Sequence, residues 1–545
     1  MSHLSKVFNK VPIKVQKRSG FDMSHENLFS ATIGTLIPAS VEEVMPGDVV
    51  SVGSALSVEL PPLATNFKGR VDARLEAFFV PNRILWAGWQ DYICQDAEHK
   101  PVVPAFSVAT DIPKVRLTSA TAGVGSLADY FGVKSFSGTS ITGEVNALPF
   151  LAYQKIWDDW YRDSNIQQPF FVDGMSTNAS LTINASTAPF MRVSGVMASS
   201  SPTDNGSQIG YNGRNLLSLA QRNFAKDYVT TMTTKPQGGD GSNLEFSVEI
   251  PDITDTQGNS VAGNGSFSIR SLRTANALQK WLERNNIGGT RYYDQILAHY
   301  GVLPSDAAFQ RAVLLGSMTT PVIVNSVAQQ SQGTNNQSKN PYANSTGAMF
   351  GRGNAFGKDS LIDNFEVKEH GYIIILFSLV PHAYYSTGTR RYLVARSKSG
   401  DWAFPEFAGI GDQEVYKYEL NSGSLVFPPD AGPDVLGYSQ RYSEYKYHDD
   451  EIHGLLQDGQ NLNSFVLSRG FDNSVALSSS MLEIPTNYMD SVMVTTAGVS
   501  GFNAIVDCYF DAKYLRPLPE YSLPTLCEGE NDGKKVYVPK GGTRL

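Results

Sequence analysis

Cysteine is scarce in this sequence, and long hydrophobic runs are missing. Of 545 residues only Cys94, Cys508 and Cys527 are cysteine, an odd number at wide spacing. This pattern forms neither a disulfide framework nor a zinc ligand set, and it favours a protein made in a reducing cytoplasm. The longest apolar run, near residues 373–380, is far shorter than a membrane span, so no membrane insertion is expected. Basic residues near the start have no apolar segment behind them, which excludes a secretory signal.

The motifs of the common enzyme classes are also missing. There is no G-x-S-x-G nucleophile elbow and no H-E-x-x-H helix. The glycines of residues 351–359 have the wrong spacing for a nucleotide fingerprint. Asp158 and Asp159 are adjacent on a predicted helix and cannot face each other across one glycosidic bond. His448 and His453 do not have a standard zinc spacing. These absences favour a structural or binding protein over an enzyme.

Aromatic and turn-forming residues are abundant, and they favour β structure. The 48 Gly and 28 Pro supply turns, while the 25 Tyr and 28 Phe favour strands. Apolar and polar residues alternate over residues 70–79, which predicts a half-buried strand that becomes apolar on both faces at Phe78 and Phe79. Pro81 then ends the ladder, because proline has no N–H to donate. We interpret this strand as the edge of a large β core where it meets an outer layer.

Further strands are predicted on both sides of the chain's centre. Residues 371–380 are almost continuously apolar, which is typical of a strand covered on both faces. Residues 29–80 read as strands broken by turns, with a strong turn signal at residues 46–48. A last strand is predicted over residues 507–514. Together these segments predict a mainly β protein.

Two segments have a helical period instead. Residues 148–163 place their aromatic side chains on one stripe, which we interpret as core packing rather than a ligand site. Residues 271–284 form the clearest predicted helix, because Ser271 can cap its start and two glycines follow its end. A shorter helical piece is predicted at residues 293–300.

The chain has no clean domain boundary, so we predict one domain over residues 1–545 with long insertions. Residues 172–213 and 237–267 are rich in Ser, Thr, Asn and Gly, and strand signals resume after each. We therefore predict that both are surface insertions. Residues 325–360 are dominated by Gln, Asn, Ser and Gly, which predicts a long mobile or surface-wrapping loop.

Charge is distributed unevenly, although the formal net charge is −9. The N-terminal arm, residues 1–28, has no acidic residue before Asp22, and its basic residues are Lys6, Lys10, Lys14, Lys17 and Arg18. The C-terminal tail, residues 528–545, is also basic, with no acid in its last twelve residues. Basic ends on an acidic body predict arms that contact a polyanion. Solvated, disordered tails explain the same charges equally well.

Short motifs in a fixed order extend over almost the whole chain. The more distinctive are RSGFDMSH at 18–25, PGD at 46–48, FFVPNR at 78–83, WYRD at 160–163, GGTRY at 288–292, EHGY at 369–372, GDQE at 411–414 and GYSQRYSEYK at 437–446. Taken together, they resemble the major capsid protein of the Microviridae, the small icosahedral single-stranded DNA bacteriophages, and of their gokushovirus branch in particular. Residues 230–239 lack the Trp-Pro run of that branch, which indicates a divergent member.

The resemblance implies an eight-stranded antiparallel jelly roll of the viral capsid type, with long loop insertions that contain a few α-helices. It implies a non-enzymatic protein, without cofactors, that is made in the bacterial cytoplasm and assembles, with pentamers as units, into a T=1 icosahedral virion around circular single-stranded DNA. Expected partners are other copies of the chain, the DNA, a small basic DNA-binding phage protein and a host cell-surface receptor. In this scheme Lys6, Lys10, Lys14, Lys17 and Arg18 face the interior and contact DNA, or else the arm ties neighbouring subunits together.

A jelly-roll carbohydrate-binding module or glycosidase is the alternative. In that case Trp86, Trp89, Trp157 and Trp160 would form a sugar platform. The two hypotheses differ in an observable way, because a sugar platform requires exposed tryptophans and a capsid core requires buried ones.

Overall fold

The computed structural model describes residues 18–520 with gaps at 87–88, 95–111, 113, 119–121, 134–141, 168–209, 212–213, 237–309, 329–348, 397–400, 410, 426–433 and 494–502, apart from a few single positions within 237–309. Several predicted features therefore lie outside the described residues. They are most of the N-terminal arm, the C-terminal tail, nearly all of the two predicted insertions, and the predicted helices at 271–284 and 293–300.

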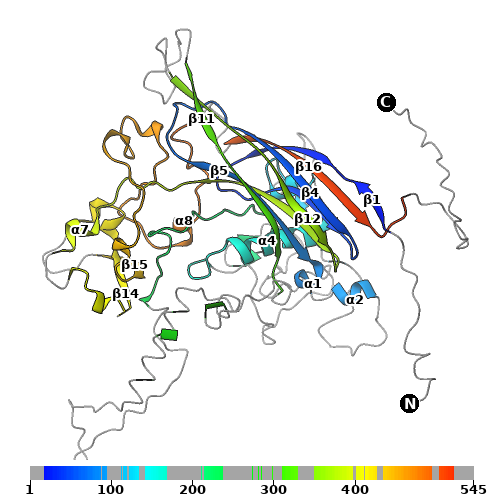
Figure 1. Ribbon diagram of the computed structural model, residues 1–545, viewed down its shortest axis with the longest axis horizontal. Coiled ribbons are helices and arrows are strands. Elements are labelled where there is room, and N and C mark those ends of the chain that lie inside the picture. The colour runs from blue at the N-terminus through cyan, green and yellow to red at the C-terminus, as the bar shows by residue number, and fades with distance from the viewer. Residues whose placement is uncertain are drawn as a thin grey trace, which may run out of the picture.

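Two antiparallel sheets form the body of the molecule (Figure 1). The larger has six strands in the order β1–β16–β4–β12–β11, and β2 also pairs with β16. These strands are β1 (Ser19–Asp22), β2 (His25–Ala31), β4 (Val49–Glu59), β11 (Ile323–Ala328), β12 (Met349–Glu366) and β16 (Ala504–Arg516). The smaller has the order β10–β5–β13–β3, formed by β3 (Ile37–Val44), β5 (Val71–Pro81), β10 (Val313–Pro321) and β13 (Gly371–Pro381).

The path of the chain between the sheets is that of a jelly roll. From β2 to β5 each strand lies in the opposite sheet from the one before it, and the same holds from β12 through β13 to β16. β1 and β2 pair with consecutive parts of β16, and only Val322 separates β10 from β11. Among the described residues, eight stretches of chain therefore build the two sheets. The mainly β, antiparallel jelly-roll class predicted from the sequence is confirmed.

The two sheets differ in how they are covered. Along β4 and β16 buried and more exposed residues alternate, so the described part of the chain packs against one face of the six-stranded sheet only. By contrast every residue of β13 is buried, as its apolar sequence predicts. Ile373 and Ile375 face the core between the sheets, while Ile374 and Leu376 face a second apolar cluster on the outer side. The smaller sheet is thus the middle layer of three.

β5 confirms the strand predicted at residues 70–79 but not its position. It lies between β10 and β13, so the interpretation of this strand as the edge of the core was wrong. Glu76, one of the polar residues of this alternating stretch, is only partly exposed, and it meets Arg222 and Tyr161 from the outer layer. Alternation in a strand can therefore mark a polar contact inside the protein as well as a solvent-exposed face.

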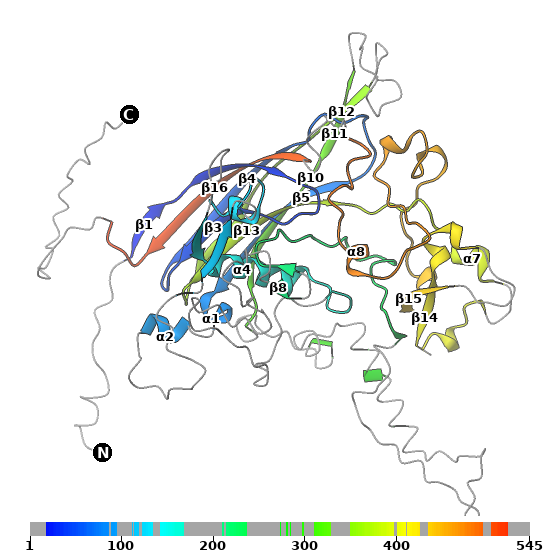
Figure 2. The same cartoon turned by 180° about the vertical axis from the view of Figure 1, so that it is seen from behind.

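The outer layer consists of short elements that cover the smaller sheet (Figure 2). They are α1 (Asn82–Leu85), α2 (Trp89–Cys94), α3 (Leu127–Tyr130), α4 (Leu148–Ile156) and the hairpins β6 (Lys114–Thr118) with β7 (Thr142–Asn146) and β8 (Gly210–Tyr211) with β9 (Arg214–Asn215). α4 continues as a π-helix, η2 (Trp157–Tyr161). Tyr153 and Trp157 of this helix are among the largest fully buried side chains, so the predicted aromatic stripe is confirmed as core. Among the described residues, no helix has the length and apolar character needed to span a membrane.

A peripheral module, residues 383–493, lies beside the sandwich with an apolar cluster of its own (Figure 1). It contains the hairpin β14 (Asp412–Tyr416) with β15 (Val435–Gln440) and the helices α7 (Arg391–Val394) and α8 (Ser479–Leu482). Its 3-10 helices are η6 (Pro405–Phe407), η7 (Lys417–Glu419), η8 (Ser422–Leu425), η9 (Ser443–Tyr445), η10 (Gly454–Leu456) and η11 (Asn463–Phe465). Val229 and Met232 complete its core, so the segment around residue 230 fastens the module to the sandwich.

The predicted loop at 325–360 is partly wrong, because its first and last residues belong to β11 and β12. Its middle, residues 329–348, lies outside the described part of the chain. The glycines that suggested a loop allow close packing instead. A Cβ at Gly351 would overlap the backbone carbonyl of Thr65, and one at Gly357 would overlap the Thr320 hydroxyl. The glycines of β12 are thus explained by crowding between strands.

We expect Gly316→Ala to lower the free energy of unfolding by about 1–3 kcal/mol. Gly316 follows a bulge between β10 and β5, and a Cβ there would overlap the carbonyl oxygen of Leu361, a backbone atom that cannot move aside. Gly20→Ala is the matched control, because no atom lies within 4 Å of its added Cβ. Urea unfolding of the two full-length variants measures the difference. Equal stabilities would contradict this account of the strand crossing.

Candidate assembly surfaces

The carboxylates of a possible glycosidase are held in ion pairs within their own helix. Asp158 pairs with Arg162, and Asp159 pairs with Lys155 at 3.0 Å. The second oxygen of Asp159 accepts the backbone N–H of Ala312 at 2.9 Å. These contacts tie the end of η2 to the start of β10. They account for both carboxylates as structural groups.

The candidate metal and phosphate motifs of the sequence do not form such sites in the part of the chain that the structure describes. No three His, Cys, Asp or Glu side chains there are arranged to hold a metal ion. His448 lies against Arg390, and His453 is an exposed neighbour of Glu451 at 3.3 Å. The glycine-rich residues 351–359 belong to β12 and form no phosphate loop.

The four tryptophans of the predicted sugar platform are packed into the outer layer. Trp157 is 1% exposed and Trp86 is 7% exposed, and the other two are half-buried. The indole N–H of Trp157 donates to the carbonyl of Gln221 at 3.1 Å, and that of Trp160 donates to Ala312 at 2.7 Å. Because stacking on a sugar requires an exposed ring face, these residues do not support the carbohydrate-binding alternative.

Of the basic arm residues only Arg18 is described, and Lys6, Lys10, Lys14 and Lys17 lie outside the described residues. Arg18 is exposed just before β1, and its guanidinium is 3.2 Å from the carboxylate of Glu366 on β12. An exposed pair of this kind contributes roughly 0–1 kcal/mol, so it leaves Arg18 free to exchange partners. The predicted interior contact of the arm stays a prediction.

A buried polar cluster joins β5 to the outer layer. The Glu76 carboxylate accepts hydrogen bonds from Arg222 and from the Tyr161 hydroxyl, each at 2.5 Å. Arg222 also donates to Ser378 of β13 at 3.0 Å and lies over the ring of Tyr161. Burial by itself would raise the pKa of Glu76, but the positive charge and hydrogen bonds of Arg222 outweigh burial and hold that pKa below its ordinary value. Glu76 is therefore ionised and paired within the packed layers.

Arg222→Leu should lower the free energy of unfolding by about 3–5 kcal/mol, because it leaves the Glu76 carboxylate buried without its cation. The exposed pair of Arg352 with Glu59 provides the control, and Arg352→Leu should cost no more than about 1 kcal/mol. Denaturant unfolding at neutral pH checks both values. If the two variants lost equal stability, the Glu76 cluster would not fix the outer layer as described.

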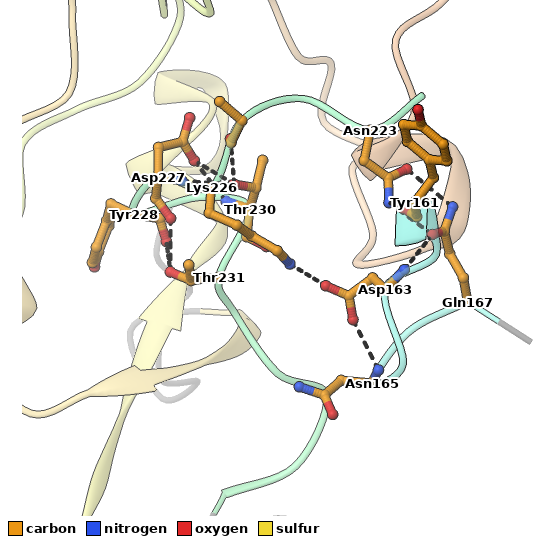
Figure 3. Close-up of polar contacts among 11 residues, drawn as sticks. Tyr161, Asp163, Asn165, Gln167, Asn223, Lys226, Asp227, Tyr228, Thr230 and Thr231 are labelled. Carbon is orange, nitrogen blue, oxygen red and sulfur yellow. Dashed lines mark hydrogen bonds and ion pairs between the residues drawn. The ribbon is translucent and has the colours of Figure 1, made fainter. Parts of the chain in front are cut away.

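A second set of polar contacts attaches the segment after Ala220 to the end of η2 (Figure 3). The Asn223 amide donates to the carbonyl of Tyr161 at 3.0 Å and to the side chain of Gln167 at 2.8 Å. Lys226 pairs with Asp163, and Gln167 also reaches Glu483 of the peripheral module at 3.0 Å. The segment is thereby held between two parts of the molecule that are distant in sequence.

Asp227 continues this connection into the peripheral module. One of its oxygens accepts the backbone N–H of Thr230 at 2.7 Å, closing a tight turn (Figure 3). The other accepts the hydroxyl of Tyr385 at 2.6 Å, and that hydroxyl also accepts from Arg469 at 3.1 Å. Burial and the nearby charge of Asp227 raise the pKa of Tyr385 well above its ordinary value, so the hydroxyl remains a donor at all physiological pH values.

Asp449 adds a titratable group to the same contact. Burial and the negative charge of Asp227 raise its pKa to about 6, against the opposing charge of Arg390 and a hydrogen bond from the backbone of Tyr228. A raised pKa means that the folded state retains a proton which the unfolded state releases. Stability from this group is therefore greatest below the ordinary pKa of 3.8 and is lost as the pH rises to about 6.

Asp449→Asn should therefore raise the free energy of unfolding at pH 7 and flatten its fall between about pH 4 and 6. The asparagine oxygen can still accept the N–H of Tyr228, so the turn is preserved. Urea unfolding over pH 4.5–7.5 tests this, with the exposed Glu406→Gln as a control that removes one charge elsewhere. An unchanged pH profile in the Asp449 variant would refute the role given to this group.

Exposed apolar side chains lie on two surfaces, and on the first of them they are interspersed with polar and charged residues. The first is the outward face of the six-stranded sheet, with Leu28, Phe356, Ile505, Tyr509 and Leu515. The second is the aromatic patch of the peripheral module, with Trp402, Phe404, Phe407, Tyr445 and Tyr447. Sequence patterns did not predict that either surface is exposed, although two motifs of the family resemblance, WAFPEF at 402–407 and GYSQRYSEYK at 437–446, include most of the second. Large exposed apolar patches mark surfaces that contact another molecule.

Comparison with known proteins identifies the family. The family model described as "Capsid protein (F protein)" matches residues 9–526. Capsid protein VP1 of Chlamydia phage 1 is 27% identical, over 95% of this chain and 97% of its own length. Capsid protein VP1 of Bdellovibrio phage phiMH2K is 26% identical over 96% of this chain and 98% of its own length. Capsid protein VP1 of Spiroplasma virus 4 is 24% identical over 93% of this chain and 95% of its own length. The resemblance predicted from the motifs is confirmed: the chain belongs to the capsid protein (F protein) family of bacteriophages and is a structural component of the virion.

Proposed function

We propose that this capsid protein assembles into a T=1 icosahedral shell that encloses a circular single-stranded DNA genome, with pentamers as assembly units. The observation that carries the proposal is the family match over nearly the whole chain, on a jelly-roll body with two exposed apolar surfaces. A shell requires each copy to cover part of its surface with neighbours, and these surfaces supply the apolar area for such contacts. A role as a structural protein without enzymatic activity is consistent with every ionic cluster described above.

Electron cryomicroscopy of the purified full-length protein, with and without single-stranded DNA, tests the shell. Uniform spherical particles with 60 copies, the number set by icosahedral symmetry, are the expected result. A protein that stayed monomeric under every condition, including with a co-expressed basic partner protein, would contradict the proposal.

The N-terminal arm is proposed to contact the packaged DNA through Lys6, Lys10, Lys14, Lys17 and Arg18. Its support is the run of positive charge on a chain whose net charge is −9. Contacts with phosphates need no sequence specificity, and they weaken as salt rises. A small basic phage protein is proposed to neutralise more of the genome. The insertions at 172–213 and 237–267 are proposed to contact a host receptor.

Replacing Lys6, Lys10, Lys14 and Lys17 with glutamine should lower the DNA content of each particle and the salt dependence of packaging. The control replaces four exposed lysines of the body, Lys68, Lys235, Lys368 and Lys446, and so changes net charge equally. The ratio of absorbance at 260 and 280 nm of purified particles reports DNA content. Normal DNA content with fewer particles would favour the rival role of the arm, tying subunits together, and normal values of both would exclude either role.

A further inference from the structure

β11 is the last strand on one side of the six-stranded sheet, with no strand beyond it among the described residues. Its register with β12 runs without a shift from Ile323 opposite Asn354 to Ala328 opposite Met349. Its residues are exposed except for Val324, and Ile323 and Val327 are 60% and 50% exposed. A regular edge strand presents unpaired backbone N–H and C=O groups at alternate residues, which can bind another strand.

The other three sheet edges of the sandwich carry features that oppose such pairing. β3 contains Pro38, Glu42 and Glu43. β10 has a bulge after Leu314 and ends in Pro321. The edge formed by β1 and β2 is broken between them and carries the acids Asp22 and Glu26. β11, with the sequence IVNSVA, has no charge, no proline and no bulge. Proteins normally protect edge strands against pairing with other chains in these ways. β11 has none of these protecting features.

We propose that β11 pairs with β11 of a second copy of the chain, antiparallel across a two-fold axis, so that the two larger sheets become continuous. The backbone groups of a strand edge select another extended backbone. Two copies of the same strand related by a two-fold axis perpendicular to the sheet run antiparallel. The absence of charge matters here, because a charged residue would face like charges when the strand met its own copy. An uncharged strand also offers nothing to DNA phosphates.

This inference rests on the proposed shell, whose icosahedral symmetry supplies the two-fold axes. The test introduces lysine at the two exposed positions, Ile323→Lys with Val327→Lys, in the full-length chain. Both side chains already face solvent, so the fold is retained. Particle yield should fall about tenfold or more, the change that follows from a loss of about 1.4 kcal/mol per contact. Val124→Lys, at a side chain 86% exposed in the outer layer, should leave the yield unchanged.

A charge-reversal experiment separates self-pairing from contact with some other surface. The aspartate version, Ile323→Asp with Val327→Asp, should assemble poorly alone. Co-expression of the lysine and aspartate chains should restore particles, because opposite charges then face each other across the pair. Failure to restore them, with both chains folded by circular dichroism, would overturn the pairing of β11 with itself.

Hydrogen exchange provides the direct readout in the wild-type protein. Backbone amides of residues 323–328 should exchange more slowly in particles than in free subunits, because their outward N–H groups become bonded. Equal exchange in particles that form normally would overturn the inference and leave the proposed shell intact. A wild-type chain that formed no particles would instead refute the proposed function itself, and with it this inference.

Discussion

The four-stranded sheet is covered on both faces, and the rest of the molecule follows from that constraint. β13 is buried along its whole length, between the core of the sandwich and the outer layer. A charged group that is buried between these layers needs a partner of opposite charge, since an unpaired buried charge is strongly destabilising. Glu76 does so with Arg222, which belongs to the segment that also carries Asp227. One buried ion pair thus links the sandwich, the outer layer and the attachment of the peripheral module.

The six-stranded sheet has the opposite character, because the described residues cover it on one face only. Its outward side chains alternate with buried ones along β4 and β16, and several of them are large and apolar. In a soluble monomer such a surface would favour aggregation. We propose that neighbouring copies of the capsid protein cover it. The body thus combines a sheet that is buried between two apolar clusters with a sheet that the described residues cover on one face.

Much of this fold could be predicted from the sequence, and the failures have physical causes. Strands at residues 70–79, 371–380 and 507–514 and the helix at 148–163 were predicted because burial imposes a period of two or near-continuous apolar character on strands and a helical stripe on helices. The position of β5 was not predicted, since a polar residue that faces Arg222 looks the same in sequence as one that faces water. The glycine-rich start of β12 predicts a loop, but its glycines are there to leave room for Thr65 and Thr320, contacts that exist only in three dimensions. The capsid family was predicted from the order of several short motifs along the chain. No single motif would have been enough for that prediction.

The central claim is that neighbouring copies cover the outward face of the six-stranded sheet. Footprinting with hydroxyl radicals, which oxidise solvent-exposed side chains, would test this claim most directly. Oxidation rates of Leu28, Phe356 and Tyr509 should fall on going from free subunits to particles. Rates for Phe377 and Leu379 of β13 should stay low in both, because the chain buries them by itself. Unchanged oxidation of the outward face in fully assembled particles would contradict the account, since that face would then remain open to solvent in the shell.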